Sequence, residues 1–78
     1  MTDDYNGWAN YATWNVALWI GNDKGLYHTA KEYQHDSAPY RAFTDVMREL
    51  NHIETPDRVA YNDRSLDTDA LDEMIREL

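Results

Sequence analysis

The stretch NYATWNVALWIG, residues 10–21, is the most apolar part of the sequence and decides the fold. Asn10 is a good N-cap residue, and Gly21 suits the left-handed position that ends many helices. Almost every residue between them is apolar, and a helix that is apolar on all sides is normally buried against several neighbours. We therefore expect a central helix from Asn10 to Ile20, although so aromatic and β-branched a run would also suit a strand.

Two further segments have the spacing of amphipathic helices. One runs from about Asp23, with Asn22 or Asp23 as its cap, to Gln34 or His35. The next begins after Ser37, whose hydroxyl can cap a helix with a proline just inside it, and ends near Asn51. The inward-facing apolar residues are Leu26, Ala30 and Tyr33 in the first segment, and Tyr40, Phe43, Val46, Met47 and Leu50 in the second.

The helical spacing is lost between residues 52 and 66, where we expect an irregular connector. Three apolar residues are expected to pin it to the core: Val59, Tyr61 and Leu66. A final helix follows a cap at Asp67 or Thr68. Its inward positions are Leu71, Met74, Ile75 and Leu78. The sequence thus predicts an all-α fold, a compact bundle of three to four helices with an irregular connector before the C-terminal helix, in one acidic domain over residues 1–78.

The composition excludes several classes of protein. The 78 residues contain 15 acidic and 7 basic side chains, a formal net charge of -8, and no cysteine. Disulfides and cysteine-based zinc sites are impossible, and direct binding to DNA or RNA is disfavoured because it needs an excess of Lys and Arg. No apolar run is long enough to cross a membrane, and the acidic start of the chain does not resemble a signal peptide, so we expect a cytoplasmic protein.

One helix face carries a candidate metal site. His28, Glu32 and His35 follow one another at i, i+4 and i+7, and imidazole and carboxylate ligands suit zinc, iron or nickel. The spacing is longer than in the familiar His-Glu-x-x-His motif, and the same residues form an ordinary polar face opposite Leu26 and Ala30. We expect no bound metal and no other cofactor.

Other catalytic signals are weak. In the absence of cysteine the candidate nucleophiles are Ser37 and Ser65, which are better explained as a helix cap and a turn residue. The three glycines form no phosphate-binding loop, and carboxylate pairs on an exposed helix lack the apolar pocket that would raise one pKa. We therefore expect a protein that is not an enzyme and has no catalytic residues.

The C-terminal helix gives a sharper signal, an acidic outer face. Its carboxylates are Asp69, Asp72, Glu73 and Glu77. Neighbours at this spacing have Cβ atoms ~5 to 6 Å apart, which is on the scale of successive phosphates along a nucleic-acid strand. Such a face, together with Asp3 and Asp4, would fit a basic groove made for nucleic acid, and salt would weaken the contact. The alternative is a solvated face that only keeps a small protein soluble.

Aromatic residues gather near the N-terminus. Half of the ten lie within one short stretch: Tyr5, Trp8, Tyr11, Trp14 and Trp19. Each buried aromatic removes ~150 to 250 Å² from water, so at least three of the five are expected in the core, where they would stand in for the missing crosslinks. Tyr5 and Trp8 precede the central helix and are expected to stay partly exposed, as anchors for a partner.

The same stretch resembles the opening of a family of small uncharacterised proteins encoded by phages and other mobile elements. The likeness rests on YNGWANYATWNVALW at residues 5–19 and GND at residues 21–23, about a quarter of the chain. VAYND at residues 59–63, with the acidic helix after it, is similar to that family's ending but less distinctive. The resemblance implies a mobile-element setting, and it brings no established activity and no catalytic residue.

Short acidic proteins from such elements often block a host defence complex. We therefore expect a non-enzymatic anti-defence inhibitor of the anti-CRISPR type, active in the host cytoplasm, whose acidic residues bind the basic nucleic-acid-handling surface of a host effector complex. Reversal of Asp69, Asp72 and Glu73 to lysine should abolish binding without unfolding the chain. The alternative is a protein-protein interaction or assembly module that docks a partner, or a second copy as a homodimer, through Tyr5 and Trp8. Nucleic acid and membranes are not expected as direct partners.

Overall fold

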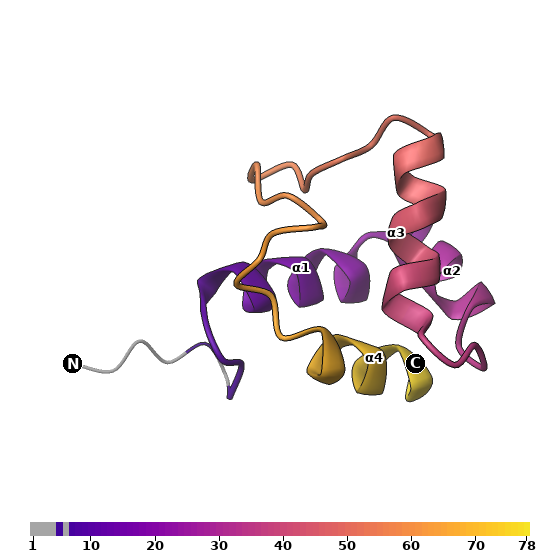
Figure 1. Ribbon diagram of the computed structural model, residues 1–78, viewed down its shortest axis with the longest axis horizontal. Helices are drawn as coiled ribbons and strands as arrows, with labels where there is room; N and C mark the ends of the chain where they lie inside the picture. The colour runs from indigo at the N-terminus through magenta and orange to yellow at the C-terminus, as the bar shows by residue number, and fades with distance from the viewer. Residues whose placement is uncertain (1–4, 6) are drawn as a thin grey trace.

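The computed structural model describes residue 5 and residues 7–78. Its helices are α1 (Tyr11–Asn22), α2 (Lys24–Glu32), α3 (Pro39–Glu49) and α4 (Thr68–Arg76) (Figure 1). α2 and α4 pack against α1, and α3 packs against α2 and α4. None of the helices in this described part of the chain is long and apolar enough to cross a membrane. The predicted all-α bundle is confirmed.

α1 begins where the sequence predicts and ends later. Oδ1 of Asn10 accepts hydrogen bonds from the backbone nitrogen (2.9 Å) and the hydroxyl (2.7 Å) of Thr13, so the predicted N-cap is confirmed. The predicted end at Gly21 is wrong, because the helix continues for one residue beyond it. The chain turns at Asp23, whose extended backbone ends α1 and whose side chain caps α2 by accepting from the backbone nitrogen of Leu26 (3.0 Å). One residue therefore sets the boundary between two helices.

α2 is shorter than the sequence predicts. It ends at Glu32 rather than at Gln34 or His35. The side-chain amide of Gln34 donates to the carbonyl oxygens of Arg76 (3.1 Å) and Leu78 (2.9 Å), at the end of α4. This long-range contact ties the segment after α2 to the end of α4, and the local spacing gives no sign of it.

α3 ends near Asn51, as predicted, but its cap at the start differs from the prediction. The N-cap is Ala38, which has no capping side chain, and the predicted Ser37 cap is wrong because the acceptor comes from α4 instead. At the other end Asn51 adopts the left-handed conformation (φ 64°), and the residue after it donates back to the carbonyl oxygen of Met47 (2.8 Å), as in a Schellman motif. Leu50 is 57% exposed, so its predicted place in the core is wrong, since the helix has already ended there.

The connector between α3 and α4 is irregular, as predicted. Thr55 and Val59 close a tight loop within it through two hydrogen bonds. Thr55 N donates to the carbonyl oxygen of Val59 (2.9 Å), and Val59 N donates to Thr55 Oγ1 (3.1 Å). An isolated antiparallel bridge between Glu54 and Ala60 flanks this loop. The predicted pinning residues are buried: Val59, Tyr61 and Leu66. The interpretation of this segment is therefore confirmed.

One hydrophobic core joins the helices and the connector. Its buried apolar residues are Val16, Ala17, Ile20, Ala30, Tyr40, Phe43, Met47, Val59, Tyr61, Leu66, Leu71 and Ile75. Phe43 is fully buried, with its ring centroid 5.8 Å from that of Tyr40 and 5.5 Å from that of Tyr61. These three rings are the aromatic part of the core.

None of the five aromatic residues of the N-terminal stretch is fully buried. Tyr11 is 45% exposed and the other four are half-buried. Trp8 packs only against the edge of the core, to which α1 contributes Val16, Ala17 and Ile20. The prediction that at least three of these aromatics form the core is wrong, because α1 turns its smaller side chains inward and its rings outward.

Candidate functional site

The polar face of α2 is open to solvent. His28, Glu32 and His35 are all exposed, and His35 lies beyond the end of the helix, so the helical spacing proposed for a metal site does not hold. The ring of His28 packs edge-on against Tyr27, with centroids 5.6 Å apart. Over residues 5 and 7–78, no three histidine, aspartate or glutamate side chains are grouped so that they could hold a metal ion.

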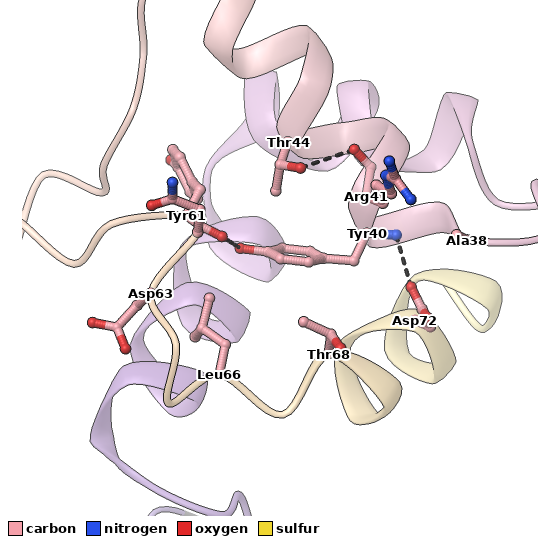
Figure 2. A pocket seen from close by; sticks show the side chains of 10 residues that line it. Ala38, Tyr40, Arg41, Thr44, Tyr61, Asp63, Leu66, Thr68 and Asp72 are labelled. Carbon is pink, nitrogen blue, oxygen red and sulfur yellow. Dashed lines mark hydrogen bonds between the residues drawn. The ribbon is translucent and has the colours of Figure 1, made fainter.

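A hollow of about 360 Å³ lies between α3, α4 and the connector (Figure 2). Inside it the hydroxyl of Tyr40 donates to the carbonyl oxygen of Tyr61 (2.7 Å). Burial raises the pKa of Tyr61 to about 12 and the pKa of Tyr40 still further, so both phenols stay protonated at neutral pH. The hydrogen bond from the Tyr40 hydroxyl therefore joins α3 to the connector.

The acidic face of α4 divides into an exposed row and a structural residue. Asp69 and Glu73 of α4 and Glu77, the C-cap residue directly after it, are exposed and recur every four residues, and we name them the acidic row. Asp72 is half-buried, and its Oδ1 accepts a hydrogen bond from the backbone nitrogen of Tyr40 (2.8 Å) in the first turn of α3 (Figure 2). Asp72 therefore joins two helices, and the acidic row is the part of the face that a partner can reach.

Arg76, the base of α4, shares a hollow with Asp69 and Glu73 of the acidic row but is engaged elsewhere. Nη2 of Arg76 donates to the carbonyl oxygen of Ser37 (3.0 Å), in the segment before α3. Within residues 5 and 7–78 no cation forms an ion pair with the acidic row. Its carboxylates are therefore available to a cationic partner. The two further acids predicted to join the face, Asp3 and Asp4, lie outside the described residues.

Replacement of Asp72 by alanine should destabilise the fold by about 1 kcal/mol, the usual effect of losing a capping side chain. Asp72→Asn keeps an acceptor oxygen at the same place and should recover most of that loss. Urea unfolding of the wild type and the two variants measures the difference. Identical midpoints for all three proteins would show that the bond to Tyr40 contributes no stability.

Trp8 lies beside the acidic row. A shallow hollow of about 570 Å³ is lined by Gly7, Trp8, Ala70, Glu73, Met74, Glu77 and Leu78. The indole of Trp8 and the side chain of Met74 supply its apolar part, and Glu73 and Glu77 supply its charged part. The fold thus brings together an aromatic anchor and two carboxylates that the sequence predicts separately, at opposite ends of the chain.

Tyr5 belongs to a different surface. Its ring centroid lies 6.1 Å from those of Tyr11 and Trp14, which are 5.7 Å apart. Leu18, on the next turn of α1, is 38% exposed. The sequence predicts Tyr11 and Trp14 in the core, whereas Tyr11 is exposed and Trp14 is half-buried. The available signal was the i, i+3, i+7 spacing of positions 11, 14 and 18, opposite Ile20 on the helix.

Comparison with known proteins places the chain in a family. A family model matches the whole of it, residues 1–78. The chain belongs to DUF7249, a family of unknown function. No curated protein and no solved structure was found to match it. The function therefore has to be inferred from the surfaces described above.

Proposed function

We propose that the protein is a non-enzymatic anti-defence inhibitor of the anti-CRISPR type, encoded by a phage or another mobile element, that binds the basic nucleic-acid-handling surface of a host effector complex. The observation that carries the proposal is the acidic row: three exposed carboxylates at one-turn spacing, with the base of the same helix bonded to Ser37 and not paired with them. The net charge of -8 adds a long-range field that favours encounter with a basic surface.

The acidic row is held in place at both ends of α4. Asp67 caps the start of the helix by accepting from the backbone nitrogen of Ala70 (3.2 Å), and Gln34 binds the last carbonyl oxygens. Residues four apart on a helix have Cβ atoms ~5 to 6 Å apart, close to the spacing of successive phosphates. Carboxylates on a fixed backbone lose less entropy on binding than those on a loop, which supports mimicry of a nucleic-acid strand.

Trp8 supports an apolar contact beside the acidic row. Together with Met74 it forms the apolar part of the hollow that Glu73 and Glu77 border. A partner that places Lys or Arg side chains along the row would also cover the indole, and aromatic residues in such positions often dominate binding energy. The acidic row and Trp8 would therefore belong to one binding surface rather than two.

A second function is favoured by the partly exposed rings at the start of the chain. The protein would be an interaction or assembly module that docks a partner, or a second copy, through Tyr5 and Trp8, both half-buried in the chain alone. Apolar contacts of this kind are insensitive to salt, in contrast to the acidic row. Salt dependence therefore separates the two functions.

The proposed function can be tested by pull-down from a nuclease-treated host lysate at low and high salt. The row variant carries Asp69→Asn, Glu73→Gln and Glu77→Gln. Asp72 stays unchanged, because its loss would remove the bond that starts α3. The control variant loses the same amount of charge from exposed positions elsewhere: Asp45→Asn, Glu49→Gln and Glu54→Gln.

The wild type and the control variant should capture the same host protein at low salt, and high salt should release it. Capture by the row variant should fall by at least about tenfold, because three charge contacts are lost. The wild type should also displace nucleic acid from the purified host protein. Equal capture by the row variant contradicts the proposal. Capture that is insensitive to salt and lost on Trp8→Ala favours the interaction module.

A further inference from the structure

The exposed side of α1, together with Tyr5 before it, forms a second surface. It consists of Tyr5, Tyr11, Trp14 and Leu18, and we name it the aromatic face. The three rings are in mutual contact, with centroids 5.7 to 6.1 Å apart, and Tyr11 and Leu18 are 45% and 38% exposed. On the helix this face is opposite Ile20, which is fully buried. The aromatic face is thus a surface that the core does not use.

Asp57 of the connector brings a carboxylate to the edge of the aromatic face. Its Oδ2 accepts hydrogen bonds from Nδ2 of Asn15 (2.8 Å) and Nε1 of Trp19 (2.9 Å). The same Nδ2 of Asn15 lies 3.5 Å from the hydroxyl oxygen of Tyr11. The carboxylate therefore lies close to both Tyr11 and Trp19, and two donors from α1 fix its position.

The carboxylate of Asp57 remains charged and keeps one oxygen free. The hydrogen bonds from Asn15 and Trp19 hold its pKa below the ordinary value, so it stays ionised at neutral and mildly acidic pH. The residue is exposed, and both donors bind Oδ2 rather than Oδ1. In the part of the chain that the structure describes, no base forms an ion pair with it. Oδ1 is therefore available to a cation from another molecule.

We propose that this carboxylate and the aromatic face bind an arginine side chain of a partner protein. The guanidinium donates to Oδ1 of Asp57 and lies against Tyr11, while apolar neighbours of the arginine cover Leu18. Arginine fits better than lysine, because its planar group stacks on aromatic rings and its N–H groups are directed at a carboxylate. A second copy is a poorer occupant, since two such faces would bring two Asp57 carboxylates together on chains that each carry -8.

The arginine site and the acidic row lie on different elements. The site uses α1 and the connector, whereas the row is on α4, and in Figure 1 the connector passes above α1 while α4 lies below it. The inference therefore does not rest on the proposed function, and each can fail without the other.

The test is an NMR titration of the full chain with short peptides, followed by the indole N–H signal of Trp19. The probe is the N-acetylated amide of Leu-Arg-Leu. Two matched peptides replace the arginine with citrulline, which has the same shape and no charge, or with lysine. We expect a saturable shift of the Trp19 signal with the arginine peptide and binding at least about tenfold weaker with citrulline, because the charge pair is lost. Lysine should bind more weakly than arginine.

Two variants complete the test. Asp57→Asn keeps an oxygen that Asn15 and Trp19 can bond, so the fold should persist while the arginine peptide binds at least about tenfold more weakly. The row variant should bind the arginine peptide as the wild type does. The inference is overturned by the absence of a saturable shift, by equal affinity of the Asp57→Asn variant, or by a citrulline or lysine peptide that binds as tightly as arginine.

Discussion

Replacement of Phe43 by alanine is expected to leave most of the chain unfolded at room temperature. Phe43 is fully buried between the rings of Tyr40 and Tyr61, at centroid distances of 5.8 and 5.5 Å. Truncation of a core phenylalanine typically costs ~3 to 5 kcal/mol. A domain below ~80 residues without crosslinks seldom has more than ~3 to 5 kcal/mol of stability, so this single change consumes nearly all of it.

The matched control is Tyr11→Ala, which deletes an aromatic ring from the surface. Tyr11 is 45% exposed and touches other half-buried rings, so its loss should lower the free energy of unfolding by only about 1 kcal/mol. Far-UV circular dichroism and urea unfolding measure both variants. A folded Phe43→Ala protein, or a Tyr11→Ala protein that unfolds as readily, would contradict the placement of Phe43 in the core and of Tyr11 at the surface.

The contrast between these two rings shows where the sequence is informative about the fold. Caps at Asn10, Asp23 and Asp67 were predictable, because each side chain bonds to a backbone nitrogen only three residues away. The buried faces of α3 and α4 were predictable too, since their polar and apolar residues separate clearly around the helix. Interactions within one turn leave their pattern in the local sequence.

The orientation of α1 could not be predicted in that way. A helix that is apolar on nearly all sides has no polar face to show which side is outside, so the composition of the stretch suggested that the largest side chains are buried. The structure buries two polar residues instead, because other segments bond to them: Asp67 N donates to Thr13 Oγ1 (3.0 Å) and Thr55 Oγ1 donates to Asn15 Oδ1 (2.8 Å). These partners are 54 and 40 residues away, so no local pattern reveals them.

The candidate binding surfaces show the same difference between local and long-range interactions. The spacing of Asp69 and Glu73 follows from the helix itself, with Glu77 at its C-cap, and the sequence predicts it directly. The capping role of Asp72 depends on Tyr40, 32 residues earlier, and the position of Trp8 beside Glu73 depends on how the N-terminal segment packs. The sequence therefore shows which residues share one face of a helix, but it does not show which faces pack together.

Replacement of Asn15 by alanine should cost about 3 kcal/mol, the second largest effect that we expect. The side chain is fully buried and bonds to both Thr55 and Asp57 at 2.8 Å. Its loss leaves the buried Thr55 hydroxyl without an acceptor and opens a small cavity, and each effect costs ~1 to 3 kcal/mol. Urea unfolding measures the free energy of unfolding of this variant. A stabilising osmolyte in the buffer keeps the destabilised protein folded at low urea concentration.

A double-mutant cycle tests whether Asn15 and Thr55 act as a pair. Thr55→Val keeps the shape of the side chain but removes both the donor to Asn15 and the acceptor for Val59 N, so it should cost about 2 kcal/mol. The double variant should be more stable than the sum of the two losses predicts, by at least about 1 kcal/mol, because neither partner then leaves the other unpaired. Thr44→Val is the control, since that hydroxyl bonds only within its own helix turn, to Arg41 O. Strict additivity in the cycle would mean that α1 and the connector are not joined through this bond.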